Sequence, residues 1–159
     1  MKTIKLILLA TMAIFLFTAC GGGDKPATGQ SETKTEEITE TKSPLEAQLA
    51  LGERIYKEKC IVCHQADAKG IPGAFPPLAN ADYLLADPVR GVAQTLNGSN
   101  EEMIVNGVVY NAPMTPQVET REEALAVINY VLKHFNGYTK DQLLDMEDIK
   151  DVVIDPIKL

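Results

Sequence analysis

Residues able to bind a cofactor gather in the segment KEKCIVCHQADAKG, residues 57–70. Cys60, Cys63 and His64 stand within five positions, although the whole chain has three cysteines and two histidines. The spacing C-x-x-C-H is the attachment signal for c-type haem. Two thiols one helical turn apart can each bond one vinyl group of the porphyrin, and the adjacent histidine then reaches the iron with Nε2. The motif therefore predicts one covalent haem c at these three residues.

Three other interpretations use the same side chains. A C-x-x-C pair can be a dithiol redox motif, but that pair usually follows a strand and opens a helix. A zinc site needs about four ligands, and the distant His134 is the one further candidate beside the motif. A disulfide between Cys60 and Cys63 would leave His64 without a role. Each alternative describes a protein without haem.

A sixth ligand to the iron must come from elsewhere, and the candidates are Met103, Met114, Met146 and His134. Met114 lies in the segment NAPMTP between two prolines, whose fixed φ angles stiffen the loop. Met103 is expected within a short helix, where it would pack in the core. His134 is expected near the end of the last helix, where it favourably meets the helix dipole. We therefore predict Met114 as the ligand, with a core methionine as the alternative.

The N-terminal part of the chain has the pattern of an export signal. Lys2 and Lys5 precede an uncharged apolar run, residues 6–19. This run is shorter than the ~20 residues of a membrane span and is typical of a signal peptide. The small residues directly before Cys20 resemble the lipobox of bacterial lipoproteins. That resemblance implies cleavage after residues 1–19 and lipid on Cys20, with an ordinary signal peptide as the alternative.

The rest of the chain divides by composition. Residues 20–43 contain few apolar side chains and many Gly, Thr, Glu and Lys, so they are expected to be a flexible tether. A folded domain is predicted at residues 44–137 and an acidic C-terminal extension at 138–159. The net charge of −7 argues against a nucleic-acid partner, because phosphates attract lysine and arginine.

The elements that must position the motif are predicted to be helices joined by long loops. Ser43 as N-cap, Pro44 at the first position and Glu46 at the third favour a helix that runs to about Lys59. Further helices are expected from near Asn80, from Asp87, from Ser99 or Asn100, from Thr120 to Gly137, and near residues 140–149. No alternating strand pattern exceeds about five residues, so we predict an all-α domain.

Residues 45–137 resemble class I cytochromes c in the attachment segment, in the NAPMTP loop and in the closing helix EEALAVINYVLKHF. The resemblance implies that family's fold, a small helical bundle with long loops wrapped around one covalent haem with His/Met ligands. It implies a close crossing of the first and last helices, where Gly52 and Tyr56 would meet Tyr130.

The same resemblance implies a proline carbonyl that accepts the ring N–H of His64, and Pro76 is predicted over Pro77. The expected walls of the haem pocket are Phe75, Leu78, Ile104 and Val105. Arg90 or Tyr110 is expected to meet a haem propionate, with an ordinary core or surface position as the alternative for each.

These residues predict a one-electron carrier and not an enzyme, because two axial ligands leave little chemistry at the iron. The segment GIPGAFPPLA followed by DYLLADP is similar to monohaem domains beside, or fused to, copper nitrite reductases and other bacterial respiratory oxidoreductases. We expect an exported, lipid-anchored cytochrome of the cell envelope that shuttles between a quinol oxidase complex and a copper nitrite reductase or terminal oxidase. The alternatives are a haem subunit of a larger oxidoreductase, docked through residues 138–159, and an open-site haem sensor or enzyme.

Overall fold

The computed structural model describes residues 42–158. The predicted signal peptide, residues 1–19, the lipid site Cys20 and nearly all of the predicted tether lie outside the described residues. The helices are α1 (Pro44–Ile55), η1 (Tyr56–Cys60), α2 (Ile61–His64), α3 (Asp82–Ala86), α4 (Pro88–Asn97), α5 (Arg121–Asn136) and η2 (Lys140–Gln142), and the strands are β1 (Met103–Val105) and β2 (Val108–Tyr110). Within residues 42–158, no helix has the length and apolar character needed to span a membrane.

Helix α1 begins where the sequence predicts but its helical path continues further. The Ser43 hydroxyl accepts from the Glu46 amide at 3.3 Å, and the Glu46 carboxylate accepts from the Ser43 amide at 2.7 Å. The chain does not leave the helix near Lys59, because it continues through the π-helical turn η1 into α2. Gln65, with φ +66°, ends it. The prediction stopped too early because no residue of the attachment motif breaks a helix, so the motif lies on helical backbone.

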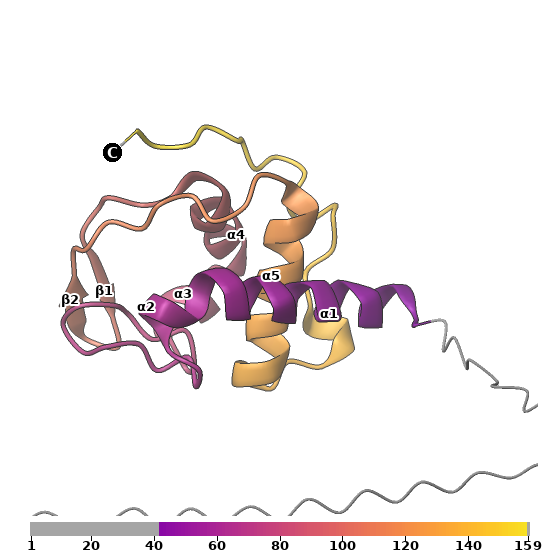
Figure 1. Cartoon of the computed structure of the whole chain (residues 1–159), viewed down its shortest axis with the longest axis horizontal. Helices are drawn as coiled ribbons and strands as arrows, with labels where there is room; N and C mark the ends of the chain where they lie inside the picture. Colours follow the sequence, from indigo (N-terminus) through magenta and orange to yellow (C-terminus); the bar gives the residue numbers. More distant parts are fainter. Residues whose placement is uncertain (1–41, 159) are drawn as a thin grey trace, which may run out of the picture. The chain divides into compact units, whose positions relative to one another are not determined.

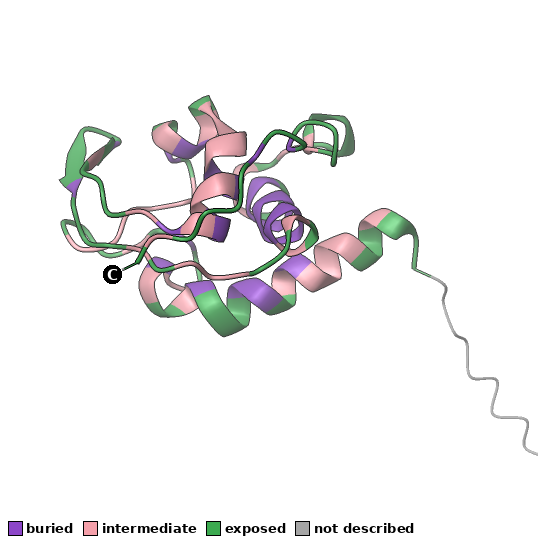
Figure 2. Cartoon of the chain, turned by 90° about the horizontal axis from the view of Figure 1, so that it is seen from above, coloured by how far each residue is buried: buried purple, intermediate pink, exposed green. Residues whose placement is uncertain are grey.

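Helices α1 and α5 cross closely, as Figure 1 shows and as the resemblance implied. A Cβ atom on Gly52 would lie 2.0 Å from the carbonyl oxygen of Ala126, so α1 can approach α5 this closely because it has glycine there. The rings of Tyr56 and Tyr130 pack at the same crossing with their centroids 5.7 Å apart. The middle of α5 is buried (Figure 2), which makes this helix the centre of the core.

The predicted ends of two more helices are confirmed. Asp87 caps α4 by accepting from the Arg90 amide at 3.0 Å, with Pro88 at the first helical position. Thr120 and Glu123 form a capping box at the start of α5. Gly137 ends that helix in the left-handed conformation, with φ +70°.

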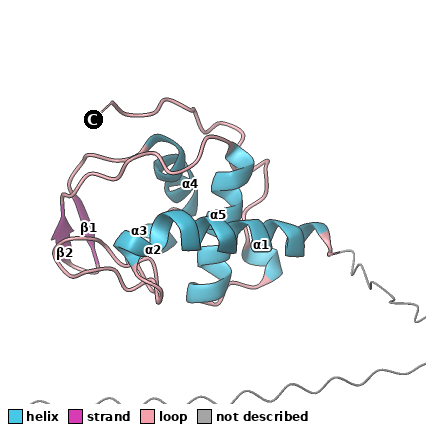
Figure 3. Cartoon of the chain, in the orientation of Figure 1, coloured by secondary structure: helices cyan, strands magenta, loops and turns pink. Residues whose placement is uncertain are grey.

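The helix expected from Ser99 or Asn100 does not form. Residues 103–110 are instead an antiparallel hairpin of β1 and β2, drawn as magenta arrows in Figure 3. Asn106 and Gly107 make the turn with φ values of +50° and +78°. An Asn-Gly pair between β-branched residues is a strong two-residue hairpin signal, and it outweighs the helix start that Ser99 or Asn100 offers.

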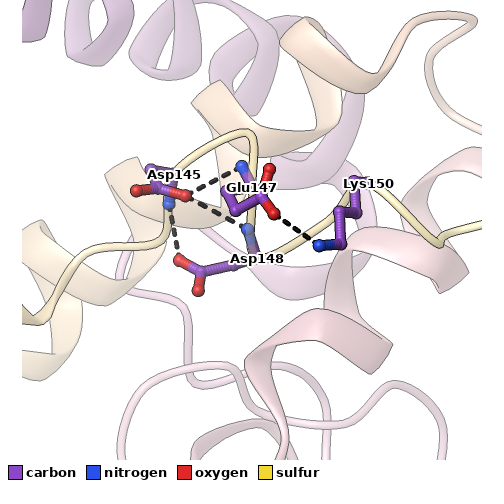
Figure 4. A network of polar contacts seen from close by, with 4 residues as sticks. All are labelled: Asp145, Glu147, Asp148 and Lys150. Carbon is purple, nitrogen blue, oxygen red and sulfur yellow. Dashed lines mark hydrogen bonds and ion pairs between the residues drawn. The ribbon is translucent and has the colours of Figure 1, made fainter.

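The acidic C-terminal segment forms no α-helix at residues 140–149, where η2 is followed by turns. Asp145 accepts from the amides of Glu147 and Asp148 at 2.8 and 3.1 Å, which stabilises a tight turn (Figure 4). Ile149 is fully buried beyond that turn. The guanidinium of Arg121 then donates twice to the carbonyl of Val152, at 3.0 and 2.7 Å. The extension therefore packs on the helices instead of projecting from them.

Candidate haem site

One cavity brings together the residues predicted to hold the haem. Its walls include Cys60, Cys63, His64, Pro76 and Met114. The predicted wall residues Phe75, Leu78 and Val105 line it as well, together with Leu84, Val127, Ile128 and Val131. Ile104 does not line it and is 59% exposed, because alternation along β1 turns it away from its neighbour Val105. The cavity is thus mostly apolar, and it is lined by α2, α4 and α5 and by the loops that contain residues 75–78 and 112–117.

The surroundings of Cys60 are unlike those of a reactive redox cysteine. Both thiols are free, Cys60 buried and Cys63 half-buried, and both border the cavity. Burial, and secondarily the neighbouring Cys63, raises the pKa of Cys60 to about 11. A dithiol that exchanges disulfides needs a lowered thiol pKa, so this environment disfavours that alternative.

The zinc alternative lacks ligands in the described part of the chain. Within residues 42–158, no three His, Cys, Asp or Glu side chains come together to hold a metal ion. His134 stacks on Tyr130 with ring centroids 5.1 Å apart, and it does not line the cavity. The distant histidine is therefore available neither to a zinc site nor as an axial ligand.

His64 is held by one ring nitrogen, which leaves the other free. Its Nδ1 lies 2.9 Å from the carbonyl oxygen of Pro76. Because a carbonyl oxygen can only accept, Nδ1 carries the hydrogen and donates a hydrogen bond to Pro76. Burial lowers the pKa of His64, while the hydrogen bond to Pro76 acts in the opposite direction. The histidine is 8% exposed. A neutral ring with an unshared pair on Nε2 is the form that binds metals.

Gly70 allows the loop that contains Pro76 to approach the histidine closely, and this glycine was not predicted as a site residue. Its amide donates to the His64 carbonyl at 2.9 Å. A Cβ atom there would lie 2.3 Å from the carbonyl oxygen of Phe75 and 2.5 Å from that of Pro76, and φ is +65°. A glycine six residues after the histidine was the available signal, because this backbone conformation favours glycine.

Met114 lies on the loop between β2 and α5, and its backbone is held by hydrogen bonds. Its amide donates to the Ser99 carbonyl at 2.7 Å, and the Ser99 amide donates to the Met114 carbonyl at 2.8 Å. Met103 also borders the cavity, from β1 and not from the helix expected. Met146 is 42% exposed and lies outside it. Two methionines therefore reach the cavity, Met103 from the paired strand β1 and Met114 from a loop held by two backbone hydrogen bonds.

Arg90, which is half-buried, supplies a positive charge to the cavity wall. Its guanidinium lies 3.7 Å above the ring of Tyr83 and donates to the Tyr83 carbonyl. Its Nε atom is buried without a hydrogen-bond partner among the described residues. Such an atom costs ~1–3 kcal/mol unless an acceptor reaches it, so a carboxylate in the cavity fits here. Tyr110, the other propionate candidate, is buried and borders the same cavity. These residues together fit a haem.

Comparison with known proteins agrees with this geometry. The sequence model of the family described as Cytochrome c matches residues 49–135. Cytochrome c-552 of Thermus thermophilus is 36% identical over 106 residues, covering 58% of this chain and 80% of that protein. The Cbb3-type cytochrome c oxidase subunit CcoP of Rubrivivax gelatinosus is 30% identical over 146 residues, covering 79% of this chain and 45% of that protein. Cytochrome c-551 of Bacillus subtilis is 35% identical over 74 residues, covering 46% of this chain and 58% of that protein.

The family match spans more than half of the chain and contains the whole attachment motif and Met114. The helical architecture, with one short hairpin, is that of the class I fold. The relatives named above share this family. The chain therefore belongs to the cytochrome c family, carries covalent haem c in a class I fold and functions in electron transfer.

Proposed function

We propose that this cytochrome is a one-electron carrier in which Cys60 and Cys63 attach the haem and His64 and Met114 are its axial ligands. The observation that carries the proposal is the single cavity bordered by all four residues. When bound, the haem supplies the Fe(II)/Fe(III) couple. With both axial positions filled by protein, the site favours electron transfer over substrate binding.

The chain's own groups set the properties of that couple. The carbonyl of Pro76 orients His64 and increases its ligand strength through the 2.9 Å hydrogen bond. A methionine thioether on the other side favours the reduced state relative to a second histidine. The apolar side chains of the cavity exclude water, and this exclusion also affects the reduction potential of the haem.

Electrons would enter and leave at the attachment edge. Val62, between the two cysteines, is 75% exposed, and Cys63 is half-buried. This places the backbone next to the predicted thioether bonds at the surface. A small contact at this edge suits the transient encounters of redox proteins.

For the cell, we propose an exported protein anchored through lipid on Cys20 and working beside a respiratory membrane. The support is the signal-like sequence of residues 1–19 and the composition of the tether. Tethering raises the local concentration of the carrier near membrane partners, of which a quinol oxidase complex, a copper nitrite reductase and a terminal oxidase are the candidates. A Cys20→Ala variant should leave the membrane fraction, and its retention there would contradict the anchor.

A second candidate is a haem subunit of a terminal oxidase. The similarity to an oxidase subunit, over 79% of this chain, favours it. Purification under mild conditions distinguishes the two. A monomer that exchanges electrons freely supports the carrier, whereas stable co-purification with oxidase subunits supports the subunit.

The optical spectrum of the oxidised holoprotein tests the axial ligands. A thioether bound to ferric haem produces a weak band at the red end of the visible range. We expect that band in the native protein, its loss in Met114→Ala and its retention in Met103→Ala, the matched control from the same cavity. Loss of the band in Met103→Ala alone would transfer the role to Met103.

A further inference from the structure

Residues 152–158, which we name the C-terminal strap, lie against the end of α4. In Figure 1 this segment, in yellow, runs past α4 to the C-terminus. Asn97 makes three hydrogen bonds to it. The Asn97 side-chain amide donates to the Val153 carbonyl at 2.8 Å, and its side-chain oxygen accepts from the Asp155 amide at 2.7 Å. The Asn97 carbonyl accepts from the Ile157 amide at 2.8 Å.

Gly98 lies close to both the strap and the loop of Met114. Its φ is +80°. A Cβ atom at this position would lie 2.9 Å from Cγ1 of Ile157 and 2.5 Å from the carbonyl oxygen of Met114. The Ile157 side chain therefore packs on backbone that itself packs on the Met114 carbonyl.

The next residue completes the connection. Ser99 and Met114 exchange two backbone hydrogen bonds of 2.8 and 2.7 Å. The amide of Gln117, three residues after Met114, donates to the carbonyl of Thr95 in α4 at 2.9 Å. The Met114 loop is therefore held by residues 95–99, and the strap contacts the same stretch through Asn97 and Gly98.

We propose that the C-terminal strap, acting through Asn97 and Gly98, is a positioning element that keeps Met114 on the haem iron. The inference rests on the proposed role of Met114 as axial ligand. Local opening of a loop depends on the contacts that hold it. A strap that stabilises residues 97–99 lowers the fraction of time in which the Met114 loop is open, and so limits access of other ligands to the sixth position.

Imidazole binding to the oxidised, full-length holoprotein measures that opening, because imidazole can take the sixth position once the methionine has left it. Asn97→Ala removes the two side-chain hydrogen bonds to the strap. We expect imidazole to bind about thirtyfold faster, as follows from losing about two ordinary hydrogen bonds. Ile157→Ala truncates a half-buried side chain and should accelerate binding by a smaller factor of about fivefold, with the thioether band still present before imidazole is added.

Two control variants alter the same C-terminal region without altering its contact with Asn97 or Gly98. Val153→Ala truncates a side chain that is 69% exposed and keeps the carbonyl that Asn97 contacts. Asp145→Ala removes the side chain that accepts from two amides in the preceding turn (Figure 4). Both should bind imidazole within about twofold of the native rate. Equal acceleration in these controls would overturn the proposal, because general loosening would then explain the effect.

Hydrogen exchange of the Met114 amide, whose acceptor is the Ser99 carbonyl, supplies a second readout. In Asn97→Ala it should accelerate by the same factor as imidazole binding, while amides in the middle of α5 keep their rates. A native thioether band with unchanged imidazole kinetics in Asn97→Ala would overturn this inference alone. Absence of the band from the native protein would overturn the ligand assignment itself, and the inference with it.

Discussion

Replacing Gly52 by alanine should separate the two helices at the centre of the fold. A Cβ atom at this position would lie 2.0 Å from the carbonyl oxygen of Ala126 and 2.8 Å from the Cβ of Tyr130. Ordinary contact begins at 3.4 Å, so the helices must move apart by about 1.4 Å. The obstructing atom is backbone and cannot rotate away. Overpacking of this kind costs at the upper end of about 1–3 kcal/mol.

Helix propensity acts in the opposite direction. Alanine is favoured over glycine in a helix by about 1 kcal/mol, so the net loss in the free energy of unfolding should be about 2 kcal/mol. Guanidinium unfolding followed by haem absorbance measures it. Ala47→Gly, at an exposed position of the same helix, is the control for the propensity effect and should destabilise by about 1 kcal/mol. If Gly52→Ala were as stable as the native protein or more so, the close crossing would be refuted.

The remaining predictions concern side chains whose hydrogen bonds or charge hold the fold or act on the haem. Asn129→Ala removes three hydrogen bonds, two of them to the backbone of Leu144, and should lower the free energy of unfolding by about 3 kcal/mol in the same assay. Tyr56→Phe removes the 2.7 Å bond to the Gln65 carbonyl and should cost about 1 kcal/mol, with an unchanged oxidised spectrum. Arg90→Leu should lower the reduction potential by tens of millivolts in a redox titration, because loss of a positive charge beside the haem favours Fe(III). Arg90→Lys should recover most of that potential, and equal potentials in all three proteins would contradict a charge effect.

Local signals predicted the parts of this fold that depend on neighbouring residues. The capping boxes at Ser43 and Thr120 and the glycine stop at Gly137 are formed by residues a few positions apart, and each was predicted from the sequence. The attachment motif is equally local. The hairpin was not predicted, although the Asn106–Gly107 turn is itself a local signal that favours a hairpin over a helix starting at Ser99 or Asn100.

Long-range contacts were harder to predict. The hydrogen bonds from Asn97 to the C-terminal strap join residues more than 50 positions apart, as in the pair Asn97 and Asp155. The acidic composition of residues 138–159 did not show whether they dock on the domain, and a few apolar residues at intervals are enough to anchor them. Pro76 was predicted through the family resemblance, whereas the close approach that Gly70 permits follows from the three-dimensional path of the loop.

Carbon monoxide binding to the reduced native protein tests the central claim most directly, because carbon monoxide occupies a ferrous haem wherever the sixth position is open. We predict that the native spectrum stays unchanged under carbon monoxide, and that Met114→Ala binds it readily. Stoichiometric binding by the native protein would contradict a closed His64/Met114 carrier and would support an open-site sensor or enzyme.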